Sequence, residues 1–115
     1  MDYLLSLGLT LVVEVPIYAV FLVGLVGVRA RSAVLAGVGV NLVSHPFGFL
    51  VLDPIVRSVA GPEPALILVE VWAWAVEALI LRSYLRRNMP TLAAISLVAN
   101  CASFATGITL IVRMR

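Results

Sequence analysis

The apolar residues of this chain form long continuous runs rather than an alternating pattern. Four such runs can be recognised, over residues 4–28, 33–52, 65–81 and 91–112. Each is about as long as a helix needs to cross the ~30 Å hydrocarbon core of a bilayer, the third being the shortest. Continuous runs argue against strands, and no closed barrel fits into 115 residues. The pattern therefore predicts an all-α membrane protein with four transmembrane helices.

Small and polar residues recur at fixed spacing within two of these runs. A first stripe, with steps of four, three and four residues, consists of Gly37, Asn41, Ser44 and Gly48. A second stripe with the same steps consists of Ser96, Asn100, Ser103 and Gly107. On a helix, each set falls on one narrow face. A Glu-Val pair followed by an Ala-Val pair also occurs twice, beginning at Glu14 and at Glu70.

These matches predict that the four helices are two parallel repeats of a two-helix hairpin. The repeats cover residues 4–52 and 65–112, joined by an outer loop over 53–64, within one membrane domain of residues 1–115. Each repeat contains two spans, so both enter the membrane from the same side, about an axis along the membrane normal. Such an axis would bring the two stripes together and make Glu14 and Glu70 symmetry mates.

Composition and charge support a multi-pass protein of the inner (plasma) membrane. The chain is 63% hydrophobic and only 12% charged, far outside the globular range. Its eight basic residues are all arginine, and five of them lie in loops 29–32 and 82–90, which the positive-inside rule makes cytoplasmic. Both termini are then outside, although Arg113 and Arg115 are a contrary signal. The net charge of +2 is explained by topology, and no nucleic-acid partner is expected.

The first run carries an acid near its middle. Glu14 lies about ten residues from the start, which at ~1.5 Å per residue places it near the membrane centre. A carboxylate in lipid is costly, so Glu14 should face protein or water, or be protonated. Pro16 should bend the helix, and Tyr18, on the Glu14 face, could donate its hydroxyl to the carboxylate. Glu14 is thus either a functional site or a protonated acid that joins helices.

The second and third runs add further titratable groups. His45 lies one turn after Asn41 and is either a proton relay or ligand, or a neutral histidine hydrogen-bonded to Glu or Asn. Glu70 and Glu77 lie two turns apart on one face of the third run. They form either a functional polar pathway or site, or structural hydrogen bonds to neighbouring side chains. Glu77 is the stronger candidate, because Glu70 is near the outer boundary and can reach water. Cys101, the single cysteine, excludes an intrachain disulfide and is expected to be a small core residue.

The candidate ion- or substrate-binding residues share a position near the midplane: Glu14, Asn41, Ser44, His45, Glu70, Glu77, Asn100 and Ser103. Intramembrane ionisable groups favour a permeation or transport component that handles protons, cations or a cationic solute. The alternative is a non-catalytic structural or accessory subunit of a larger membrane complex.

Other functional classes are not expected from these residues. An enzyme is not expected, since two acids and one histidine lack the spacing of a metal motif, and no cofactor or metal ion is predicted. The expected partners are the lipid bilayer and either copies of this chain, as a homo-oligomer, or partner membrane subunits.

Two resemblances follow from these motifs. An E-x-P in the first run, N-x-x-S-H-P in the second, paired Glu in the third and N-x-x-S in the fourth make the chain resemble small bacterial four-helix membrane proteins that are uncharacterised. That resemblance implies a fold and transfers no function. The chain is also similar, by analogy only, to the small multidrug resistance family, through its length, its four helices and the acid of Glu14-Val15. It departs from that family in lacking the later proline and tryptophan pattern and in carrying three intramembrane acids.

Overall fold

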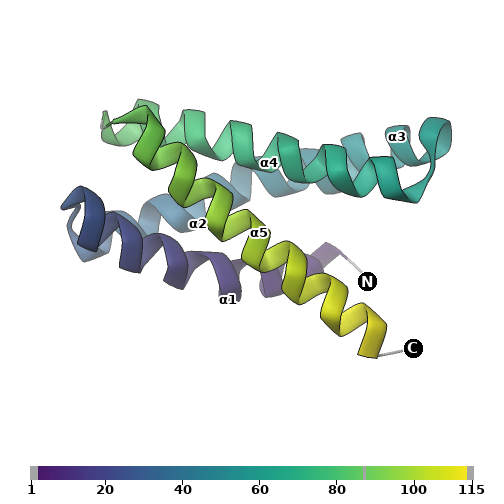
Figure 1. The fold of residues 1–115 in the computed structure, drawn as a ribbon, viewed down its shortest axis with the longest axis horizontal. Coiled ribbons are helices and arrows are strands. Elements are labelled where there is room, and N and C mark those ends of the chain that lie inside the picture. Colours follow the sequence, from purple (N-terminus) through teal and green to yellow (C-terminus); the bar gives the residue numbers. More distant parts are fainter. Residues whose placement is uncertain (1–2, 87, 114–115) are drawn as a thin grey trace.

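The computed structural model describes residues 3–86 and 88–113, and every element in these ranges is helical (Figure 1). In chain order the elements are α1 (Tyr3–Phe21), the π-helical turn η1 (Leu22–Val26), α2 (Ala30–Phe47), the π-helical turn η2 (Gly48–Leu52), α3 (Asp53–Ala60), α4 (Pro62–Leu85) and α5 (Met89–Arg113). Four helical stretches are long and apolar enough to cross a membrane: Tyr3–Val26, Ala30–Ala60, Pro62–Leu85 and Met89–Leu110. The prediction of an all-α chain with four membrane-spanning helices is therefore confirmed.

The four long helices form a ring in which each contacts two neighbours. α1 packs against α2 and α5, and α4 packs against the same two helices from the opposite side. The connections from α1 to α2 and from α4 to α5 lie at one end of the bundle, whereas α3 and both ends of the described chain lie toward the other (Figure 1). The longest dimension is 41 Å, enough to cover the ~30 Å hydrocarbon core with margins at the headgroups.

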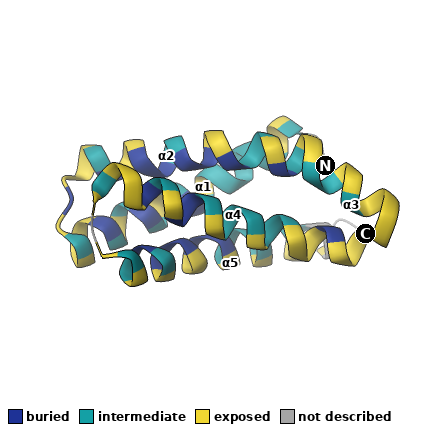
Figure 2. Ribbon diagram, turned by 90° about the horizontal axis from the view of Figure 1, so that it is seen from above, coloured by how far each residue is buried: buried dark blue, intermediate teal, exposed yellow. Residues whose placement is uncertain are grey.

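Large apolar side chains cover the outside of the ring. Val12, Val20, Leu35, Val43 and Leu79 are all exposed, and buried residues lie mainly on the inner faces of the helices (Figure 2). Such a surface is stable only where it meets lipid or another apolar surface. Cys101 is also exposed, so its expected place in the core is wrong. Its small side chain faces outward from α5 instead.

The second membrane span is longer than the sequence analysis expected. Residues 53–60, assigned above to the outer loop, form α3 and continue the line of α2 and η2. Pro54 does not interrupt them, because it occupies the first turn of α3, where a missing N–H is tolerated. Gly61, at φ 95°, ends α3 in a backbone conformation that favours glycine, and Pro62 begins α4 directly afterwards. The turn between the helices is thereby reduced to Gly61.

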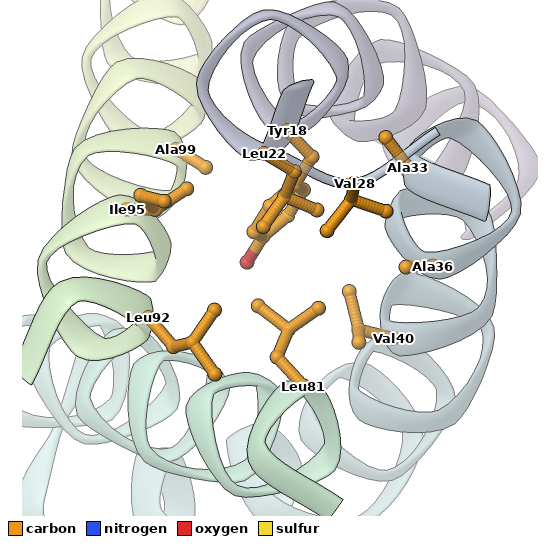
Figure 3. Close-up of a cluster of buried hydrophobic side chains, with 10 residues drawn as sticks. All are labelled: Tyr18, Leu22, Val28, Ala33, Ala36, Val40, Leu81, Leu92, Ile95 and Ala99. Carbon is orange, nitrogen blue, oxygen red and sulfur yellow. The ribbon is translucent and has the colours of Figure 1, made fainter. Parts of the chain in front are cut away.

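The apolar core fills the half of the bundle nearest the two short connections. Figure 3 shows its side chains converging from all four long helices: Tyr18, Leu22, Val28, Ala33, Ala36, Val40, Leu81, Leu92, Ile95 and Ala99. The hydroxyl of Tyr18 lies at the centre of this ring. The other half of the bundle surrounds a cavity.

Candidate ion-binding site

A cavity of about 260 Å³ occupies the half of the bundle beyond the apolar core. All eight candidate residues line it: Glu14, Asn41, Ser44, His45, Glu70, Glu77, Asn100 and Ser103. They come from α1, α2, α4 and α5, so the fold brings together side chains that lie far apart in the sequence. Asp53 and Arg57 of α3 line the far end of the same cavity, and the space therefore runs from mid-bundle toward α3.

Glu77, at the floor of the cavity, collects hydrogen bonds from three helices. Its Oε1 accepts from the Tyr18 hydroxyl at 2.6 Å and from Asn100 Nδ2 at 3.3 Å, and its Oε2 accepts from the Ser44 hydroxyl at 2.7 Å. The residue is only 1% exposed. Each donor neutralises part of the carboxylate charge that burial would otherwise make costly. Glu77 is therefore the group around which α1, α2 and α5 converge on α4.

Glu14, also 1% exposed, lies on the opposite wall of the floor. Its Oε2 accepts a hydrogen bond from the Ser103 hydroxyl, which links α1 to α5. Its Oε1 is buried and receives no donor from the described residues. Glu14 and Glu77 both line the cavity, and they bond to Ser103 and Asn100, which lie on one turn of α5. Two buried acids are thus neighbours at the floor of the cavity.

The two asparagines make matching contacts within their own helices. Asn41 donates to the Gly37 carbonyl at 2.8 Å, and Asn100 donates to the Ser96 carbonyl at 2.8 Å. Among the described residues no hydrogen bond joins Asn41 to Asn100, so the stripes face a common cavity without bonding through these amides. The Oδ1 of Asn41 is buried without a donor.

His45 lies closer to the mouth of the cavity. Its Nε2 is 3.1 Å from the Ser6 hydroxyl of α1, and its ring packs against Tyr3 and Phe49, with centroids 5.4 and 5.6 Å away. Nδ1 is buried and has no partner among the described residues. Within the described part of the chain the imidazole forms no hydrogen bond to an acid or an asparagine, unlike the neutral histidine considered from the sequence.

Glu70 differs from the other two acids in its surroundings. It is half-buried on the cavity wall and makes no hydrogen bond to another described residue. Nearer the mouth, Asp53 and Arg57 form an ion pair at 3.2 Å within α3. The positive charge of Arg57 is therefore already engaged. The sequence-based preference for Glu77 over Glu70 agrees with this difference in burial.

Two fully buried residues that support the floor, Tyr18 and Ser96, were not among the eight candidate residues. Tyr18 was expected to contact Glu14 one turn away on its own helix, but its hydroxyl crosses the ring to Glu77. Ser96 donates to the Trp74 carbonyl at 3.1 Å and ties α5 to α4. The signal for Tyr18 was Gly37, because a Cβ there would lie 3.2 Å from the Tyr18 Cβ. That close approach directs the tyrosine inward.

The stripe glycines are not equivalent. A Cβ on Gly48 would lie 3.3 Å from the Val69 side chain and 3.5 Å from Trp72, whereas one on Gly107 would meet nothing within 4 Å. Close helix contact therefore requires glycine in the first stripe but not at the end of the second.

Two tryptophans fix the rotation of α4. Trp72 Nε1 donates to the Ser44 carbonyl of α2 at 3.3 Å, and Trp74 Nε1 donates to the Ala93 carbonyl of α5 at 2.8 Å. The side chains point to different neighbours, as their positions on opposite sides of the helix require. Held from both sides, α4 presents Glu77 and Glu70 to the cavity.

A metal centre finds no support in this arrangement. Among the described residues, no three His, Cys, Asp or Glu side chains are grouped so that they could hold a metal ion.

The chain matches no protein-family model, no curated protein and no solved structure. The function of the protein is therefore inferred from the geometry of its cavity.

Proposed function

We propose that this chain is a membrane permeation or transport component that binds protons, cations or a cationic solute at the floor of its cavity. The observation that carries the proposal is the convergence of Glu14, Glu70 and Glu77 on one cavity that ends at an apolar core. Ionisable residues inside membrane helices mark ion and substrate pathways by default, because a purely structural role rarely compensates for their desolvation.

The charge balance of the cavity favours a positive ligand. Among the described residues, four carboxyl groups and one arginine line it, and the arginine, Arg57, is paired with one of the four, Asp53. The free buried oxygens, Glu14 Oε1 and Asn41 Oδ1, are both acceptors. A ligand that supplies hydrogen-bond donors or positive charge satisfies them, and an anion does not.

The apolar core supplies the closed gate that such a component needs. Tyr18, which bonds Glu77, and Leu81, one turn after Glu77 on α4, belong to the apolar core beyond the cavity floor. A solute that enters from the α3 end stops at this floor until the core rearranges. Binding at Glu77 competes with the Tyr18 hydroxyl, so ligand occupancy and opening of the core are coupled through one hydrogen bond.

We further propose the repeat architecture and the orientation inferred from the sequence. The equivalent amide contacts of Asn41 and Asn100 support two parallel hairpins, and so does the way Ser44 bonds Glu77 while Ser103 bonds Glu14. In this pairing Glu77, and not Glu70, is the counterpart of Glu14. The arginine loops lie at the end sealed by the core, so in an inner membrane the cavity opens to the outside with both termini.

The alternative function, a structural or accessory subunit, also has a supporting observation. The side-chain bonds of Tyr18, Ser44 and Ser103 to the acids all join different helices, as polar groups in membrane scaffolds do. The exposed apolar surface is compatible with partner membrane subunits or with self-association.

Purification and flux measurements separate the two functions. The purified chain, reconstituted in liposomes with an internal pH dye, should move protons in response to a cation gradient. Glu77→Gln should abolish this flux with little change in thermal stability, because the amide oxygen retains the bonds from Tyr18 and Asn100. Glu63→Gln, an exposed residue at the start of α4, is the matched control and should retain flux. Absence of flux from every variant, together with a foreign subunit in stoichiometric amount, would favour the scaffold.

A further inference from the structure

The hydrogen bonds divide the two floor acids into unequal partners. The two oxygens of Glu77 accept hydrogen bonds from Tyr18, Asn100 and Ser44, which is the pattern expected around an ionised carboxylate. Glu14 accepts a hydrogen bond only from Ser103, at Oε2, and its buried Oε1 has no donor among the described residues. The protein therefore supplies three donors to one acid and one donor to the other.

The nearness of the two buried acids requires a proton. Both line the floor of the cavity, they bond to Asn100 and Ser103 on one turn of α5, and neither forms a salt bridge with a described residue. Two neighbouring carboxylates in a buried site repel each other, whereas a carboxylic acid beside a carboxylate can donate a strong hydrogen bond to it. A proton on Glu14 supplies the donor that its Oε1 lacks, whereas a proton on Glu77 would add a further donor to an acid that already accepts three hydrogen bonds.

Among the described residues, no other charged group near the pair replaces this proton. α4 contributes Glu77 and Glu70, which are both acidic, and α2 contributes His45, whose Nε2 contacts Ser6 on the mouth side. α1 itself adds the neutral Tyr18, and the polar groups of α5 at the floor are uncharged. The ion pair of Asp53 with Arg57 is at the far end of the cavity.

We propose that Glu14 and Glu77 form an acid–carboxylate pair that holds one exchangeable proton on Glu14. On unloading, the O–H bond of Glu14 breaks, the proton passes to water in the cavity, and the second negative charge is compensated by an incoming monovalent cation. This inference deepens the proposed function by naming the proton site, and it rests on that function only for the exchange with a cation.

Infrared spectroscopy of the purified chain in detergent at neutral pH tests the assignment. Wild type should show a carboxylic acid C=O band that shifts in D₂O. Glu14→Gln should lose this band and remain folded, because its amide N–H donates to Glu77 as the acid would. Glu77→Gln should retain the band at a shifted frequency, and Glu70→Gln, on the same helix and the same cavity wall, should leave it unchanged.

The infrared spectra test the proton site on Glu14 independently of any transport activity. A band that survives in Glu14→Gln and disappears in Glu77→Gln would overturn the assignment, and so would the lack of any protonated carboxyl band in wild type. The predicted band pattern in a chain that moves no protons in liposomes would uphold the acid–carboxylate pair and refute only the transport function.

Discussion

Removing the hydroxyl of Tyr18 tests the contact that crosses the ring from α1 to α4. Tyr18→Phe deletes one 2.6 Å hydrogen bond to Glu77 and leaves the ring of a fully buried side chain in place. Hydrogen bonds between membrane helices average ~0.6 kcal/mol and reach ~1.7 kcal/mol. A bond to a charged acceptor lies toward or above the upper value, at about 1.5–3 kcal/mol in soluble proteins. We therefore expect Tyr18→Phe to lower the free energy of unfolding by about 1–2 kcal/mol, roughly a 5–30-fold change in the folding equilibrium.

The measurement is unfolding by a denaturing detergent in mixed micelles, followed by circular dichroism or tryptophan fluorescence. The matched control is Tyr84→Phe, because the Tyr84 side chain is 58% exposed near the end of α4. Surface changes of this kind normally stay within ~0.5 kcal/mol. If Tyr18→Phe and Tyr84→Phe are equally stable, the tyrosine hydroxyl does not bond the buried acid and the convergence on Glu77 is wrong.

Three further variants test packing, hydrogen bonding and topology. Gly37→Ala places a Cβ 3.2 Å from the Tyr18 Cβ and should lower the free energy of unfolding by about 1–2 kcal/mol. Gly39→Ala, whose Cβ would meet nothing within 4 Å, should leave it unchanged. Equal effects of the two variants would refute the close α1–α2 contact. Replacing Asn41 and Asn100 together by Leu should lower the unfolding free energy by about 1–3 kcal/mol. Asn100→Leu should account for more of this loss, because Asn100 also donates to Glu77, and a double variant as stable as wild type would contradict this role. In a Cys101→Ser background, cysteine at Ser58 should react with an impermeant thiol reagent from outside and cysteine at Ser32 should not, whereas the reverse pattern would invert the orientation.

The sequence predicted the spans and the residues of the cavity because both depend on local patterns. Continuous apolar runs identify membrane helices without tertiary information. Helical periodicity then places Asn41 with Ser44 and Asn100 with Ser103, and burial of polar groups in lipid forces such faces inward. The same reasoning ranked Glu77 above Glu70, in agreement with their burial in the structure.

The partners of these residues could not be predicted, because they depend on how the helices rotate against each other. Tyr18 is one turn from Glu14 in sequence, yet the close approach of α2 at Gly37 directs its ring to Glu77. Helix α3 was missed for a different reason. Pro54 and Pro62 are typical of a loop such as the one expected over residues 53–64, but each occupies the start of a helix, where proline is tolerated.

Cation-induced proton release shows directly whether the cavity floor exchanges a proton for a cation. Purified chain in weakly buffered detergent solution is mixed with sodium chloride or methylammonium chloride, and a pH dye reports the protons released per chain. If the floor of the cavity exchanges a proton on Glu14 for a cation, wild type should release about one proton, Glu70→Gln should do the same, and Glu14→Gln should release none. Absence of release from wild type with either salt, or undiminished release from Glu14→Gln, would contradict the account.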